Sequence, residues 1–225
     1  MGGTYEVTGN SQSGTVKFTG NGVFRSTIAK SGSGEDIDYA QKLDGSENYP
    51  IVFDDGGLDR TWATAIKASN KAGFTKMGSG TLTLGKEPLY TGLTTVKEGT
   101  LVVPEGSDIT YNPLSAGTLS GVTPTKFAYP AGTTLTGAES SKTFDGTLDV
   151  SNVTAIDVSD ATLTEGTPFV VAAATTVTGF TKDTIVLTLP AGTDPAKWTV
   201  KIMSIDAKRS LCVAPPTNPF VIIVR

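Results

Sequence analysis

The sequence predicts an all-β protein whose middle region is a short parallel β-helix, also called a β-solenoid. Three observations predict this fold class: helix signals are scarce, the chain is cut into short β phrases, and a Gly-Thr-Leu phrase recurs at nearly regular spacing. The β phrases are rich in Thr and Val and end at Gly, Asn, Asp or Pro. A β-sandwich is the alternative, because its strands would share the same turn residues.

The recurring phrase is the main evidence for a solenoid. It begins at Gly80, Gly99, Gly117 and Gly146, and a looser Gly-Thr-Thr-Leu form begins at Gly132. Successive glycines in this series are 19, 18, 15 and 14 residues apart. Short strands repeated at such spacing indicate stacked coils, in which each strand pairs with its counterpart about 4.8 Å away in the next coil.

Alternation within the phrase predicts which side chains face the interior. Thr81 and Thr83 are expected to face outward, and the leucine of one phrase to stack on the leucine of the next. Gly80 and Gly99 are expected at corners, where a positive φ or a close backbone approach excludes a Cβ atom. The expected inward-facing residues are Leu82, Leu84, Val96, Leu101, Val103, Leu119, Leu148 and Val150.

One window is ambiguous between helix and strand. In the segment 58–71, Leu58, Trp62 and Ile66 recur every four residues, as on one face of a helix. Apolar and polar residues also alternate there, and glycines bound the segment on both sides. We favour a strand.

Composition excludes several classes of function. The 225 residues include no His, a single Cys and a net charge of −4. The absence of His removes the commonest general base and zinc ligand, and Cys212 is expected to be a small buried hydrophobe. The acidic balance argues against a nucleic-acid partner, and no apolar stretch reaches the roughly 18 residues of a membrane span.

Residues 73–103 resemble the passenger-associated repeat of bacterial autotransporter proteins. Two departures lie in a turn, where Lys86 to Leu89 replace small residues and Asn, and Leu93 replaces a Gly. The resemblance implies a secreted or surface-displayed right-handed parallel β-helix and brings no catalytic residues. The matching residues are Lys76, Gly78, Gly80, Thr81, Leu82, Leu84, Tyr90, Thr91, Gly92, Thr94, Thr95, Val96, Gly99, Thr100 and Leu101.

The region after Gly146 also resembles the end regions of such passengers. Three strands are expected there, containing Leu148–Ser151, Phe169–Ala172 and Trp198–Lys201, with a short terminal strand at Val221–Val224. The Pro-rich segment Ala214–Phe220 is expected to cover strand edges at the end of the solenoid, with a docking peptide as the alternative.

Acidic side chains gather in two segments that could carry chemistry. Asp54, Asp55 and Asp59 lie in one Gly-rich turn, but they lack the ligand spacing of an EF-hand, so turn formation is expected. Glu35, Asp36 and Asp38 could in principle serve glycoside hydrolysis, but solvated loop charge is the expected role. Glycan contacts are conceivable at Tyr39, Tyr49 and Trp62.

We therefore expect residues 1–51 to form an N-terminal cap or irregular first coils, residues 52–142 the repeat coils, and residues 143–225 terminal coils or a β-capping subdomain. The expected function is a non-enzymatic structural or adhesive segment of a bacterial secreted or surface protein. The alternative is a carbohydrate-binding or polysaccharide-degrading β-helix module. No catalytic, cofactor or metal site is expected, and glycans or surface proteins are the expected partners. The amino terminus shows no signal peptide, so the sequence is expected to belong to a longer chain.

Overall fold

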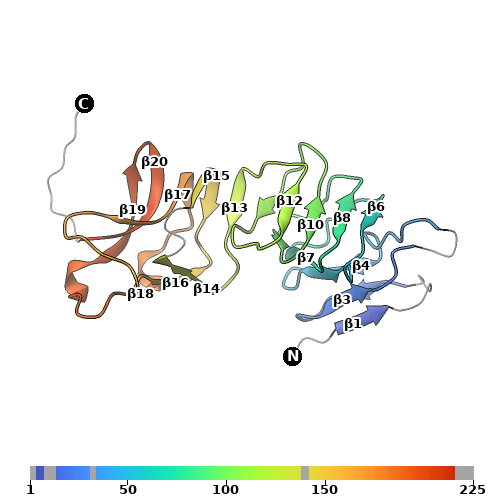
Figure 1. Ribbon diagram of the computed structural model, residues 1–225, viewed down its shortest axis with the longest axis horizontal. Helices are drawn as coiled ribbons and strands as arrows, with labels where there is room; N and C mark the ends of the chain where they lie inside the picture. Colours follow the sequence, from blue (N-terminus) through green and yellow to red (C-terminus); the bar gives the residue numbers. More distant parts are fainter. Residues whose placement is uncertain (1–3, 8–13, 31–33, 138–141, 216–225) are drawn as a thin grey trace. The chain divides into compact units, whose positions relative to one another are not determined.

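Short strands joined by turns make up nearly all the secondary structure of the described residues (Figure 1). The computed structural model describes residues 4–7, 14–30, 34–137 and 142–215. The chain divides into unit 1, Met1–Pro124, and unit 2, Thr125–Arg225. None of the described helices is long and apolar enough to cross a membrane.

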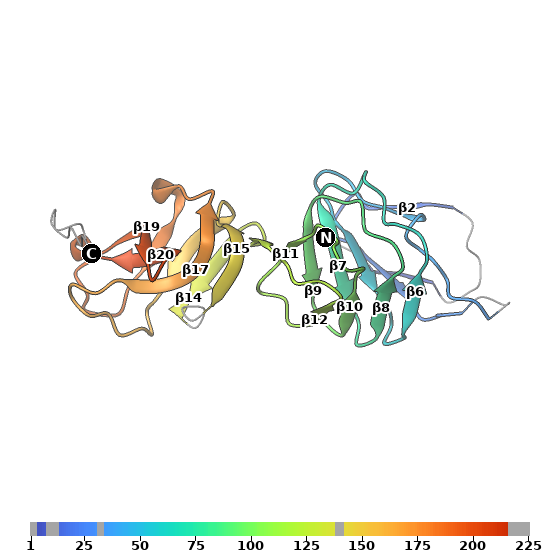
Figure 2. The same cartoon turned by 90° about the horizontal axis from the view of Figure 1, so that it is seen from above.

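Unit 1 is built from parallel strands that pair one coil apart. One sheet has the order β1-β3-β5-β7-β9-β11, a second the order β12-β10-β8-β6, and β2 pairs with β4. Figure 2 shows β6, β8 and β10 side by side in the second sheet. The strands are β1 (Thr4–Val7), β2 (Val16–Lys17), β3 (Val23–Ser26), β4 (Leu43–Asp44), β5 (Ile51–Asp54), β6 (Arg60–Trp62), β7 (Gly73–Met77), β8 (Thr81–Leu84), β9 (Leu93–Val96), β10 (Thr100–Val102), β11 (Thr110–Tyr111) and β12 (Thr118–Ser120).

The strand register confirms the predicted stacking of the repeat. Leu82 in β8 lies opposite Leu101 in β10, which lies opposite Leu119 in β12, and all three strands are parallel. Parallel neighbours one coil apart are consistent with a β-solenoid and differ from the antiparallel sheets of a sandwich. The predicted inward residues are buried, except that Leu119 is half-buried and packs against the core of unit 1.

The two predicted corner glycines have different reasons to be glycine. Gly99 has φ +62°, a left-handed conformation that costs other residues about 1–2 kcal/mol. Gly80 has no positive φ, but the backbone of Leu58 lies where its Cβ atom would be. Both corners therefore let one coil lie directly on its neighbour.

The interior of unit 1 contains a row of aromatic rings. Neighbouring ring centroids in the row are 4.7–6.4 Å apart, in edge-on, tilted and stacked arrangements. Aromatic pairs at such distances add to the free energy of area burial. Trp62, at the centre of the row, is fully buried and ends β6, so the ambiguous window contains a strand at Arg60–Trp62 followed by turns. The row consists of Phe24, Tyr39, Phe53, Trp62, Phe74 and Tyr90.

Unit 2 begins with parallel pairing and ends in an antiparallel hairpin. Its sheets have the orders β13-β15-β17-β20-β19 and β14-β16-β18. The pairs β13–β15, β15–β17, β14–β16 and β16–β18 are parallel, whereas β17–β20 and β19–β20 are antiparallel. The strands are β13 (Lys126–Ala128), β14 (Thr133–Thr136), β15 (Thr143–Asp149), β16 (Val153–Asp157), β17 (Phe169–Thr178), β18 (Val186–Thr188), β19 (Thr199–Ile205) and β20 (Lys208–Ala214), with short 3-10 helices at Lys182–Thr184 and Pro195–Lys197.

The expected strands of the terminal region are present. Leu148 lies in β15, the segment Phe169–Ala172 begins β17, and Thr199–Lys201 begins β19. The predicted terminal strand at Val221–Val224 and most of the Pro-rich segment 214–220 lie outside the described residues. The expected division into residues 1–51, 52–142 and 143–225 stays a prediction.

Candidate functional site

The acidic turn after β5 forms hydrogen bonds within and between coils. Asp54 accepts a bond from the Gly56 amide at 2.8 Å, and Asp55 accepts one from the Gly57 amide at 2.8 Å. Asp59 reaches the next coil, where it accepts a bond from the Thr81 amide at 2.7 Å. Asp54 and Asp55 therefore serve turn formation, as the sequence predicts, whereas Asp59 joins two coils; the described residues contain no group of three or more His, Cys, Asp or Glu that could hold a metal ion.

Asp55 also belongs to an ion pair that lies completely inside unit 1. The Nζ atom of Lys76 is 2.6 Å from Oδ2 of Asp55, and neither side chain is exposed to solvent. The same ammonium donates to the carbonyl oxygens of Met77, Gly78 and Glu98 at 3.3, 2.6 and 3.1 Å. Lys76 therefore links the coil that contains Asp55 to the coil that contains Glu98.

A second buried cation makes similar contacts one coil earlier. The Arg60 guanidinium donates to Oγ of Ser26 at 3.2 Å and to the carbonyl oxygens of Ile28, Asp55 and Ser26, the first two at 2.5 and 2.8 Å. Its central carbon lies 5.5 Å from the centre of the Phe53 ring. Burial lowers the pKa of Arg60. We call Asp55, Arg60 and Lys76 the interior charge cluster.

Both cations occupy positions that otherwise hold apolar side chains. Arg60 lies opposite Leu82 in the register, and Lys76 lies between Phe53 and Val96. The acceptors of both cations are mainly backbone carbonyls, which removal of either cation would leave buried without a donor. The cluster is enclosed and holds neighbouring coils together, so it has the geometry of a structural link.

The second acidic segment is also occupied by structural bonds. Asp36 pairs with Lys30 and accepts a bond from the Thr61 amide at 2.8 Å. The hydrogen bond from Lys30 is the main reason that the pKa of Asp36 is lowered. Asp38 accepts bonds from the amide and hydroxyl of Thr64 at 2.7 and 2.8 Å. Glu35 is exposed.

The glycan contact considered at Tyr39 and Trp62 is wrong. Tyr39 and Trp62 are 3% and 0% exposed, because both belong to the aromatic row, so neither can reach a ligand at the surface. Tyr49 is half-buried and packs against the core of unit 1. Cys212 is a buried hydrophobe, as predicted, and burial raises its pKa to about 11.

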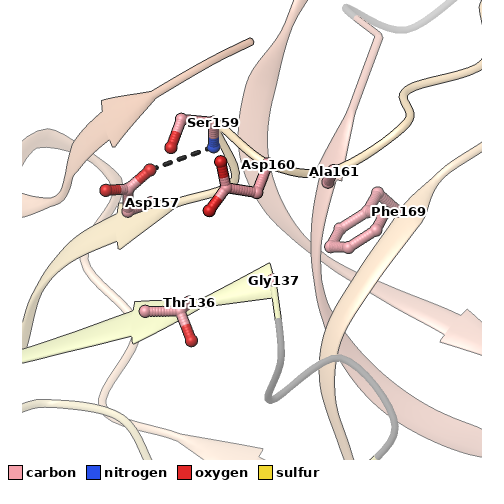
Figure 3. Close-up of a pocket in the computed structure, with 7 residues that line it drawn as sticks. All are labelled: Thr136, Gly137, Asp157, Ser159, Asp160, Ala161 and Phe169. Atoms are coloured by element: carbon pink, nitrogen blue, oxygen red, sulfur yellow. Dashed lines mark hydrogen bonds between the residues drawn. The ribbon is translucent and has the colours of Figure 1, made fainter.

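Unit 2 carries a surface pocket of about 430 Å³ at the ends of β14 and β16. Figure 3 shows the Asp160 carboxylate on the side of Asp157 and Ser159, with the Phe169 ring on the other side of Ala161. Asp157 accepts a hydrogen bond from the Ser159 amide at 3.0 Å, and this bond is the main cause of its lowered pKa. The lining residues are Thr136, Gly137, Asp157, Ser159, Asp160, Ala161 and Phe169.

The turn beside this pocket is one of two turns with the same three residues. Asp149-Val150-Ser151 and Asp157-Val158-Ser159 each place the valine in the core and the aspartate on the serine amide, at 2.9 and 3.0 Å. In the first turn the Gly179 backbone lies beside the Asp149 carboxylate. The second turn opens into the pocket. The repeated Asp-Val-Ser was the sequence signal that could have located it.

Comparison with known proteins places one segment of the chain in a family. Residues 74–103 match the passenger-associated-transport-repeat, which confirms the resemblance of this segment to the repeat of autotransporter passengers. The match begins in β7, contains β8 and β9, and ends just after β10. It therefore contains Lys76 and the corner at Gly99, but not Asp55 or Arg60. No curated protein and no solved structure matches the chain.

Sequence reasoning missed the interior charge cluster. The sequence pattern identifies Lys76 only as part of the repeat, and it does not single out Arg60. The available signal was register: if Trp62 stacks on Leu84, then Arg60 must stack on Leu82 and point inward. The partners of both cations are carbonyl oxygens, which leave no trace in the sequence.

Proposed function

We propose that this chain is a non-enzymatic scaffold segment of a bacterial secreted or surface-exposed protein, built as a right-handed β-solenoid. The observation that carries the proposal is the interior charge cluster within an in-register parallel stack. Its charges bond to the backbone of successive coils and none of the three is exposed. The passenger-associated-transport-repeat at residues 74–103 supports export to the cell surface.

The mechanism we propose is mechanical. Pulling on the two ends of a parallel stack loads the backbone ladders between successive coils in series, and the buried links add resistance between coils. The antiparallel hairpin β19–β20 follows β17 where parallel pairing ends, and we propose that it acts as a cap against further strand addition. An adhesive role would come from surface loops on this scaffold.

The test is forced extension of the full chain through handles at its two ends. We expect unit 1 to resist and then open in steps, with each coil of about 20 residues releasing roughly 7 nm of chain. The control is the same chain with Lys76 replaced by Met, which should open at lower force. Smooth extension without resistance would contradict the scaffold proposal.

The non-enzymatic part of the proposal has a separate test. The chain is incubated with soluble neutral and acidic polysaccharides, and new reducing ends are measured against a heat-denatured sample. We expect no release above that control. Release that is lost in Asp157→Asn or Asp160→Asn variants would show a polysaccharide-degrading module instead.

A further inference from the structure

We propose that the pocket in unit 2 is a binding site for a neutral hexopyranose, the terminal sugar of a glycan. This proposal goes beyond the scaffold function and does not depend on it. The pocket has an apolar wall, two carboxylates and two hydroxyl groups, and no lysine or arginine among its lining residues. Its volume of about 430 Å³ is within the range of small-molecule sites, roughly 300–1,000 Å³.

The carboxylates give the pocket strong acceptors for sugar hydroxyls. Asp157 is held in place by its own turn, through the bond from the Ser159 amide. Among the residues that the structure describes, Asp160 has no hydrogen bond or ion pair, and its carboxylate lies on the same side of the pocket as Asp157 (Figure 3). Hydrogen bonds to a charged acceptor are about twice as strong as neutral ones. Two such groups suit a ligand with several adjacent hydroxyls.

The Phe169 ring supplies the second part of the recognition. Phe169 begins β17 and is partly buried against the core of unit 2, so the ring is held by packing. One face of a pyranose presents C–H groups, which carry partial positive charge and pack well on the negative face of an aromatic ring. A ligand with hydroxyls at one edge and C–H groups on one face therefore fits the pocket chemically.

The charges also exclude competing ligands. Carboxylates at Asp157 and Asp160 would repel sialic acids, uronic acids and phosphate groups, since the pocket lining offers no cation to neutralise them. For a divalent cation the pocket offers only two carboxylates, since the described residues hold no group of three or more Asp, Glu, His or Cys side chains.

Internal comparison separates this pocket from a second one in the same unit. The second pocket contains Trp198, but its lining also includes Lys197, which pairs with Glu165 at 3.4 Å, whereas no lysine or arginine lines the Asp157 pocket. The Asp149 turn has the Gly179 backbone beside its carboxylate, whereas the Asp157 turn lines the pocket. The geometry therefore favours the Asp157 pocket.

The experiment is an NMR titration of the ¹⁵N-labelled full chain with methyl glucopyranoside and methyl galactopyranoside. We expect millimolar affinity for at least one of them, with shifts at the amides of residues 136–137 and 157–161. Glucuronate is the anionic control and should cause no shift there. Asp160→Asn should weaken binding roughly tenfold, since a charged acceptor becomes neutral.

A plug variant tests the cavity itself. A Cβ atom at Gly137 would lie 3.7 Å from Cβ of Ala161 and 3.9 Å from Cζ of Phe169, both ordinary contacts. Gly137→Leu should therefore fill the pocket and abolish binding with the fold intact, while Gly137→Ala should bind nearly as well as the parent chain. Asp206→Asn, on the β19–β20 turn, is the matched charge control and should have no effect.

Four outcomes would overturn the proposal. These are no shift at tens of millimolar of either sugar, shifts centred on Trp198, equal binding of glucuronate, or shifts at residues 157–161 with Ca²⁺ but not with the sugars. Each of them leaves the forced-extension test of the scaffold unaffected.

Discussion

Units 1 and 2 use parallel strands in two different ways. In unit 1 the paired strands keep an unbroken register, the interior contains an aromatic row, and the interior charge cluster joins successive coils. In unit 2 the register shifts at Thr133/Thr134, Phe144/Thr147 and Val170/Ala172, and the core is mostly aliphatic. Regular coils can thus be held by specific polar links, whereas irregular coils depend on adaptable apolar packing.

The largest expected effect comes from breaking the buried ion pair of unit 1, between Lys76 and Asp55. Lys76→Met would leave the Asp55 carboxylate buried and unpaired, and we expect unit 1 to lose about 3–5 kcal/mol of its free energy of unfolding. Urea unfolding followed by Trp62 fluorescence, in a Trp198→Phe background, measures unit 1 alone. The matched control is Lys71→Met, whose exposed pair with Glu47 should leave the midpoint unchanged.

The double variant Lys76→Met/Asp55→Asn separates lost charge pairing from lost packing. It removes both charges, so it should recover part of the stability lost in the single variant. If the double variant is no more stable than Lys76→Met, the ion pair is not the source of the effect.

The next largest effect is expected from replacing a glycine of positive φ in each unit, Gly99 in unit 1 and Gly132 in unit 2. In Gly99→Ala the new Cβ atom would overlap the Gly80 carbonyl and lie 2.6 Å from the Gly78 oxygen, so we expect a loss of about 2–4 kcal/mol. In Gly132→Ala φ is also positive, at +76°, but the space is open, so the loss should be about 1–2 kcal/mol. Thermal unfolding followed by circular dichroism compares them, and equal losses would mean that backbone crowding contributes nothing.

The two units should also differ in stability at alkaline pH, because each contains one buried group whose pKa is raised. The pKa of Cys212 is raised from 9.0 to about 11. The folded state therefore favours the neutral thiol, and the stability that this gives unit 2 is complete below pH 9 and is lost as the pH rises toward 11. The pKa of Tyr90 is raised from 10.0 by burial, so the matching loss in unit 1 starts only above pH 10. As the pH is raised from 8 to 10.5, the urea midpoint of unit 2, followed by Trp198 fluorescence, should fall before the midpoint of unit 1, followed by Trp62 fluorescence. The Cys212→Ala substitution should remove this early fall in unit 2.

The smallest expected effect is a gain. Within the described residues, positive φ outside glycine occurs only at Asp206 and Ala207, with φ of 48° and 63° in the β19–β20 turn. Ala207→Gly should relieve the left-handed cost and stabilise unit 2 by about 0.5–1 kcal/mol. Ala131→Gly, at a turn without positive φ, should give no gain; a gain in both would point to a cause other than backbone conformation.

The sequence predicted the parts of the fold that depend on local chemistry. The repeated Gly-Thr-Leu predicted the stacking of Leu82 on Leu101, and both are fully buried. The glycan contacts at Tyr39 and Trp62 were wrong, because alternation alone does not tell how thick the aromatic interior is. The pocket in unit 2 was not predicted either, since it depends on how the ends of β14 and β16 and the start of β17 come together.

The hydrogen bonds that the Lys76 ammonium donates bear on how such a chain can gain or lose coils. Most of its acceptors are main-chain oxygens, which every coil carries whatever its side chains are. If a gene segment encoding one turn of about 20 residues is duplicated, the new turn offers the Lys76 ammonium the same kind of backbone carbonyl oxygens. Only the carboxylate at Asp55 would need to be copied with it. This architecture can therefore lengthen by the addition of whole coils.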